Sequence, residues 1–266
     1  MCKVGDIVLL GQFSSDIDPL DLLTAIAQRA AGGTLLIVQV RSLQSPEAQI
    51  LVNRNMWLDR GVRQVRLAHI RLPFDIGSNA LLSDIDAAHC ILFLTENAVS
   101  FVEWFQHTRV FQHVVTAHQG GTAIAAWGDS ATALSAAVAR RSSASLDQTV
   151  LDSPFSPGLK LIPAIVMEIA LPSEQELHEL LAAVLNDPTL LGIGIGGSTG
   201  VIIRQNRYLH VIGHEEVVIL DASSLCDTAH GIDRLMQFAE VDVRLLIEGD
   251  TYDLAMRSTI EPVNCG

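Results

Sequence analysis

Short apolar runs alternate with amphipathic segments along the first half of the chain, and this alternation restricts the possible folds more than any other feature. The strand-length apolar runs are Asp6–Leu10, Thr34–Val40, Val65–Ile70, Cys90–Leu94 and Thr122–Ala126. The segments with helical periodicity are Pro19–Ala31, Pro46–Arg60 and Phe101–Ala117. Strands that alternate with helices at this spacing form right-handed crossovers, so the pattern predicts a mostly parallel sheet between two layers of helices.

The second half of the chain has a different pattern of polar and apolar residues. Arg140–Gly158 is polar and serine-rich, which is typical of an exposed loop. A strand at Ala164–Ile169 and a helix at Ser173–Leu185 follow, and then come closely spaced short strands at Leu190–Ile195, Gly200–Ile203, Leu209–Ile212, Val217–Leu220 and Val243–Ile247. Their short polar connections predict antiparallel hairpins that complete the sheet. With no internal repeat, we expect residues 1–266 to form a single domain.

Composition excludes several classes of function. The chain has 17 Lys and Arg against 30 Asp and Glu, a formal net charge of −13, which disfavours nucleic acid as a partner. It contains no apolar run of about 18 residues, so we expect no membrane span. The four cysteines, Cys2, Cys90, Cys226 and Cys265, lack the spacing of metal ligands, and the reducing cytoplasm is the expected location. We expect no cofactor and no metal.

The stretch from Gly120 to Ala133 carries the strongest functional signal. An apolar strand opened by two glycines leads into a tight turn with Ser130, and an alanine-rich helix begins at once. A serine in such a turn can present its hydroxyl above the sheet edge, near backbone N–H groups that stabilise an oxyanion. It can equally cap the helix. The local pattern leaves both interpretations open.

Several motifs in the same order resemble the cyanophycinase and peptidase E family of serine peptidases. Besides the elbow, they are Gly158–Pro163, Leu190–Ile195, the pair Val211–Gly213 and Val217–Asp221, and Gly249–Leu254, which together fall within residues 34–254. In the family, Gly158–Pro163 corresponds to Gly-Leu-Gly-Leu-Leu-Pro. The resemblance implies a three-layer α/β sandwich of the flavodoxin-like or class I glutamine amidotransferase-like type, with antiparallel strands in the C-terminal half. It also implies Ser130 as the nucleophile.

The departures from the family pattern fall on the catalytic positions. Alanine stands at Ala170, where the family has its general-base histidine, and Gly197 replaces the acid that orients this histidine. The family's Phe-Thr-Gly-Gly-Asp-Gln segment becomes Phe93–Ala98, which has lost both glycines. Since the members of a catalytic triad act as a unit, these changes argue against efficient amide hydrolysis.

Two hypotheses of different classes follow. In the first, the chain is a non-catalytic binding or partner subunit, with Asn97, Asp129 and Ala131 beside Ser130 as candidate binding residues. In the second, it is a divergent serine hydrolase that cleaves a small peptide or acyl substrate. Candidates for the missing groups are then Glu168 as the acid and His210 or His214 as a relocated base. The resemblance further implies a homodimer or hetero-oligomer and a peptide or small-molecule ligand.

Overall fold

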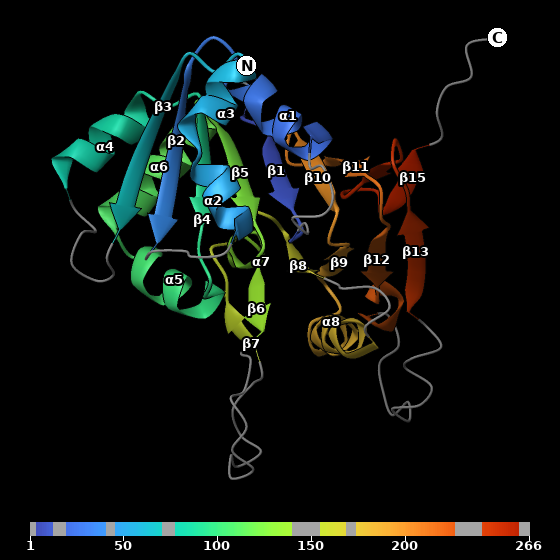
Figure 1. Ribbon diagram of the computed structural model, residues 1–266. Helices are drawn as coiled ribbons and strands as arrows, with labels where there is room; N and C mark the ends of the chain where they lie inside the picture. Colours follow the sequence, from blue (N-terminus) through green and yellow to red (C-terminus); the bar gives the residue numbers. More distant parts are fainter. Residues whose placement is uncertain are drawn as a thin grey trace.

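The computed structural model describes residues 4–12, 20–40, 46–70, 78–139, 155–168, 174–226 and 241–260. Its main sheet contains five parallel strands (Figure 1). In spatial order they are β1 (Ile7–Leu10), β5 (Ala123–Trp127), β4 (Cys90–Leu94), β2 (Thr34–Val40) and β3 (Gln64–Ile70). The apolar runs of the sequence therefore lie side by side, and their carboxyl ends share one edge of the sheet.

Four antiparallel strands extend this sheet beyond β1. They are β10 (Thr199–Arg204), β11 (Tyr208–Gly213), β14 (Thr251–Asp253) and β15 (Ser258–Ile260). Because β10 runs opposite to β1, its first residues lie at the carboxyl end of β1, with Leu10 paired to Gly200. The connection from β11 to β12 therefore starts at the same edge as the elbow.

A second sheet contains the remaining long strands of the C-terminal half. Its order is β13 (Asp242–Leu246), β12 (Val217–Asp221), β9 (Leu191–Ile195) and β8 (Ala164–Glu168), and only β8 and β9 are parallel. A two-stranded hairpin, β6 (Ala137–Ala139) with β7 (Phe155–Pro157), precedes it. The prediction that all the late strands complete one sheet is therefore wrong for β9, β12 and β13.

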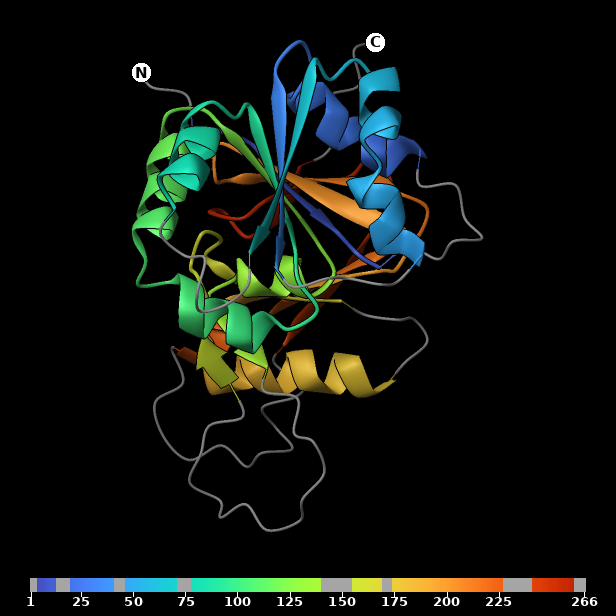
Figure 2. The ribbon, with the colours of Figure 1, turned by 60° about the vertical axis from the view of Figure 1, so that its left-hand side comes forward.

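Helices cover both faces of the main sheet, and the central strands β1, β2, β4 and β5 are accordingly buried along their whole length. On one face lie α1 (Leu20–Arg29), α2 (Pro46–Val52) and α3 (Arg54–Asp59), and on the other α4 (Asn79–Asp86), α5 (Ala98–Phe105) and α6 (Arg109–Gln119) (Figure 2). Side chains such as Val8 face the first group, whereas Ile7 and Leu9 face the second. The predicted α/β class with parallel central strands and antiparallel C-terminal strands is confirmed.

The second sheet shares its core with the main sheet. Ile193, Val217 and Ile219 pack in the same buried cluster as Ile7 and Leu9. The opposite face of the second sheet is covered by α8 (Glu174–Asn186) (Figure 1). A short 3₁₀ helix (Ser223–Cys226) follows β12. In the described part of the chain, no helix is long and apolar enough to cross a membrane.

Two predicted helices are each divided by a polar cap. Asn53 accepts a hydrogen bond from the Asn55 N–H and starts α3, so Pro46–Arg60 forms two helices. Thr108 accepts from the Phe111 N–H and starts α6, which separates it from α5. Side-chain acceptors at these positions satisfy N–H groups that have no partner inside the helix, and they fix a new helix start.

Candidate functional site

The sharp turn of the elbow lies at Gly128, between β5 and the short helix α7 (Asp129–Ala133). Gly128 has φ 56° and ψ −126°, a conformation that side-chain-bearing residues adopt only at a cost in free energy. Its N–H donates to the Leu10 carbonyl at 3.0 Å, and its own carbonyl accepts from the Ala131 N–H at 2.9 Å. The apex of the turn is thus a glycine, and Ser130 follows two residues later.

Ser130 is the second residue of α7 and is completely buried. Its Oγ accepts a 2.7 Å hydrogen bond from the backbone N–H of Thr95, which directly follows β4. The hydroxyl therefore links the ends of two neighbouring parallel strands. The interpretation of Ser130 as a helix cap is wrong, because the cap position is Gly128 and no side chain caps α7.

The three candidate binding residues lie around this hydrogen bond. Asn97 is exposed and caps α5, with its Oδ1 accepting from the Ser100 N–H at 2.8 Å. Its backbone N–H lies 3.3 Å from Thr95 Oγ1, so it is one step removed from Ser130. Asp129 is half-buried in the first turn of α7, and Ala131 is buried. Of the three, Asn97 alone is exposed.

The connection between β11 and β12 brings His214 to the same sheet edge. His214 is exposed, and its N–H donates to the Ser198 carbonyl at 3.2 Å. The next residue, Glu215, directs its carboxylate to the Gly197 N–H at 2.8 Å. Glu215 was not among the residues predicted from the sequence. Its position directly after His214, in the turn that follows Gly213, could have identified it as a candidate acid. A carboxylate thus lies next to Gly197, the position at which the family resemblance implies an acid.

The other candidates lie elsewhere. His210 is inside β11, opposite Ile202, and its Nδ1 lies 3.1 Å from Thr251 Oγ1. Burial is the main cause that lowers the pKa of His210, and the nearby Arg204 and Arg29 lower it further. Glu168 ends β8 in the second sheet, opposite Ile195. Ala170 lies outside the described residues.

No described histidine forms a hydrogen bond with Ser130, whose hydroxyl accepts from the backbone N–H of Thr95. His118 lies at the entering end of β5, as the sequence predicts, where its Nδ1 is 3.2 Å from the Thr122 carbonyl. Burial lowers the pKa of His118. Among the described residues, no three His, Cys, Asp or Glu side chains gather closely enough to hold a metal ion.

Comparisons with known proteins agree with this fold. The chain superposes on a peptidase from an acI-B1 Actinobacterium with a TM-score of 0.66 and 18% identity, over 95% of this chain and 98% of that one. It superposes on a candidate peptidase E of Listeria monocytogenes with a TM-score of 0.55 and 12% identity, over 79% of this chain and 98% of that one. The fold is that of these peptidases.

Sequence comparison gives the relationship. No family model matches the chain. It is 29% identical to the cyanophycinase of Geminocystis herdmanii over 109 residues, which cover 40% of this chain and only 39% of that protein. It is 20% identical to the cyanophycinase of Synechococcus elongatus over 257 residues, which cover 94% of this chain and 79% of that protein. The chain is thus related to the cyanophycinase and peptidase E family.

Proposed function

We propose that the chain is a non-catalytic member of this peptidase scaffold and acts as a binding or partner subunit. The observation that carries the proposal is the elbow, where Gly128 occupies the apex and Ser130 is completely buried. In nucleophile elbows the reactive side chain lies at the sharp turn, where its hydroxyl is exposed above the sheet. A glycine at that point presents no nucleophile.

The surroundings of Ser130 support the same proposal. A serine hydroxyl is a weak nucleophile and needs a base within hydrogen-bond reach. Here the Oγ accepts from the Thr95 N–H and has no exposed surface, so a substrate carbonyl has no path to it. Ser130 then serves the fold, by satisfying a buried backbone donor at the junction of β4 and α7.

A fluorophosphonate probe tests this proposal. We expect no labelling of the folded protein, whereas the Geminocystis cyanophycinase under the same conditions serves as the positive control. Labelling that disappears in Ser130→Ala would show an activated serine and contradict the proposal.

The alternative, a divergent serine hydrolase, is favoured by one observation. The Glu215 carboxylate lies beside Gly197, and the exposed His214 precedes it in the chain. In this mechanism His214 takes the proton of Ser130 as Oγ bonds to the acyl carbon, and the protonated imidazole then returns it to the leaving group. The step requires the Thr95–Ser130 hydrogen bond to open. Probe labelling that is lost in both Ser130→Ala and His214→Ala would favour this alternative.

We further propose that the chain forms a homodimer through strand β13. This strand is the edge of the second sheet, and Val243 and Leu245 within it and Ile247 just after it are each more than half exposed. Val243 and Leu245 pair with residues of β12 that α8 buries, so they continue this apolar face to the edge of the sheet, where they are exposed. An open strand edge with apolar side chains suits the same edge of a second copy, which pairs with it antiparallel around a two-fold axis. The expected location remains the cytoplasm.

A further inference from the structure

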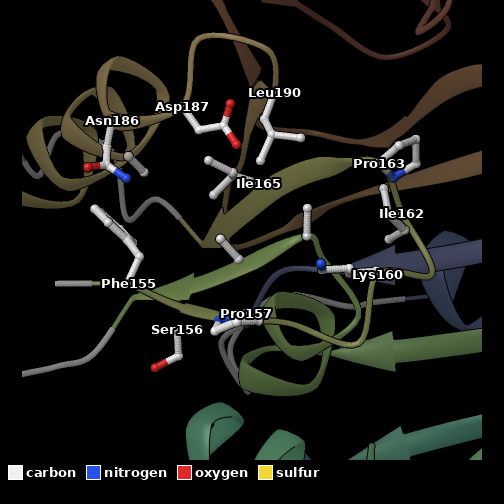
Figure 3. A pocket seen from close by; sticks show the side chains of 13 residues that line it. Phe155, Ser156, Pro157, Lys160, Ile162, Pro163, Ile165, Asn186, Asp187 and Leu190 are labelled. Atoms are coloured by element: carbon white, nitrogen blue, oxygen red, sulfur yellow. The ribbon is translucent and has the colours of Figure 1, made fainter. Parts of the chain in front are cut away.

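A cavity of about 490 Å³ lies between the β6–β7 hairpin, the start of β8 and the end of α8 (Figure 3). Its apolar surface comes from Phe155, Ile165 and Leu190, with alanines of β6 and α8 between them. Both the volume and the apolar lining are typical of sites that hold small molecules. The residues that line the cavity include neither Gly128 nor Ser130, so it is separate from the elbow.

Two groups of opposite charge enter the cavity from different walls. Figure 3 shows the Lys160 side chain reaching in from the segment after β7 and the Asp187 carboxylate reaching in from the end of α8. Within the described part of the chain, no ion pair joins Lys160 and Asp187. Asp187 is held in place because its Oδ1 accepts hydrogen bonds from the N–H and Oγ1 of Thr189 at 3.2 and 2.5 Å. Asn186 adds an amide on the same wall.

The backbone at Lys160 is held in an unfavourable conformation. Its φ of 57° is in the left-handed region, where the related family motif Gly-Leu-Gly-Leu-Leu-Pro has glycine. Backbone hydrogen bonds from Lys160 to Ser135 and from Leu161 to Leu134, both 3.0 Å, fix this segment against the end of α7. Strained residues persist where the surrounding structure enforces them, and they cluster at functional sites. A lysine here costs stability that a glycine would not.

We propose that this cavity binds a small amphipathic zwitterion. The anionic group of the ligand pairs with the Lys160 ammonium, and its cationic group pairs with the Asp187 carboxylate. The apolar body between them packs on Ile165 and Leu190. A molecule with a carboxylate and an ammonium separated by a short hydrocarbon chain has this chemistry. The inference uses no part of the elbow, and it goes beyond the proposed function.

Titration with 6-aminohexanoate, followed by NMR of methyl groups, tests the proposal. We expect saturable shifts of the Ile165, Leu190 and Ala137 methyl signals at millimolar concentration. Hexanoate and hexylammonium each carry only one of the two charges, so we expect each to bind about tenfold more weakly. Absence of shifts at these methyl groups, or equal binding of all three compounds, would overturn the proposal.

Substitutions test which residue binds each charged group of the ligand. Lys160→Met keeps the length of the side chain and is expected to weaken 6-aminohexanoate about tenfold, to the level of hexylammonium. Lys160→Gly should weaken binding to the same extent. Because glycine adopts a positive φ without strain, this variant should also have a higher free energy of unfolding than the wild type. Asp187→Asn retains an acceptor for Thr189 and should reduce binding to the level of hexanoate. Asp59→Asn, an exposed acid on α3, is the matched control and should bind as the wild type does. Undiminished binding in Lys160→Met would refute the assignment of the anion site.

This experiment is independent of the proposed function. Ser130→Ala should leave the titration unchanged, because Ser130 does not line the cavity. Probe labelling of Ser130 would overturn the non-catalytic proposal and leave the proposed ligand of the cavity unaffected. Absence of zwitterion binding would overturn the cavity proposal and would say nothing about catalysis.

Discussion

The backbone N–H of Thr95 and the hydroxyl of Ser130 form a 2.7 Å hydrogen bond inside the protein, at the ends of adjacent parallel strands. Both residues are buried, at 5% and 0% exposure, so water cannot replace either partner. Ser130, the residue that the sequence marks most strongly as functional, therefore stabilises the carboxyl-terminal edge of the sheet.

Ser130→Ala should destabilise the protein. The Thr95 N–H would lose its acceptor in a buried position, which costs roughly 1–3 kcal/mol in the free energy of unfolding. Urea denaturation followed by circular dichroism measures this difference. Ser83→Ala, on the exposed side of α4, is the control and should change stability by less than about 0.5 kcal/mol. An Ser130→Ala variant as stable as the wild type would show that the hydrogen bond contributes nothing.

Gly128→Ala should destabilise the protein more than Gly32→Ala does. Both glycines have positive φ, 56° and 69°, and a Cβ at Gly32 would have no atom within 4 Å. Gly32→Ala therefore measures the left-handed backbone cost alone, about 1–2 kcal/mol. At Gly128 the φ of 56° is combined with a ψ of −126°, outside the left-handed helical region, so a side chain there adds strain to the backbone beyond the cost at Gly32. Equal losses in thermal unfolding would contradict this.

Asp253 should make stability depend on pH in the acid range. Hydrogen bonds from Arg207 are the main cause that lowers the pKa of Asp253 to about 2, and the N–H groups of Met256 and Ala255 lower it further. Since the unfolded chain takes up the proton at higher pH, this stabilisation is present above pH 4 and is lost as pH falls towards 2. Denaturation at a series of pH values should show a smaller slope in this window for Asp253→Asn. Asp242→Asn, which removes the half-exposed ion-pair partner of Arg244, is the control for the loss of a surface carboxylate.

Cys90 should be unreactive in the folded protein. Burial in β4 raises the pKa of the thiol to about 12, so almost no thiolate exists at neutral pH. Iodoacetamide treatment followed by peptide mapping should find Cys90 modified only after denaturation. Rapid modification under native conditions would indicate that β4 opens without global unfolding.

Leu245→Asp should convert a dimer to a monomer. Light scattering of the wild type is expected to give twice the chain mass of 28.7 kDa, and that of the variant the single mass. Leu67→Asp is the matched control, because Leu67 is also an exposed leucine on an edge strand, β3 of the main sheet. A monomeric wild type, or dissociation by Leu67→Asp alone, would contradict an interface at β13.

The sequence predicted the strands of the main sheet far better than the site. Runs such as Thr34–Val40 and Cys90–Leu94 are apolar throughout because they are buried on both faces, and their bounds were predicted without error. The separation of β9 from β10 into two sheets left no local signal, because both strands are mostly apolar and only the short turn 196–198 lies between them. A single domain over residues 1–266 stays a prediction, with which the shared buried cluster agrees.

At the site, the order of motifs predicted the elbow, but not which of its residues forms the apex. That distinction depends on whether the turn begins at Gly128 or at Ser130, and either residue is small enough to fit against the strand. The register of β5 beside β1 and β4 decides it, and this register depends on contacts with distant parts of the chain. Glu215 was missed for the same reason, since its contact with Gly197 joins residues on different sides of a hairpin.

The place of β1 in the main sheet has a consequence for biosynthesis. Ile7 pairs with Ile124 on one side and with Ile203 on the other, so β1 gains its second neighbour only after the chain has been made as far as β10. Contacts between such distant segments slow folding, and an apolar strand that waits for its partners is exposed to aggregation. We therefore expect a chaperone and β10 to compete for binding to Ile7–Leu10 during synthesis.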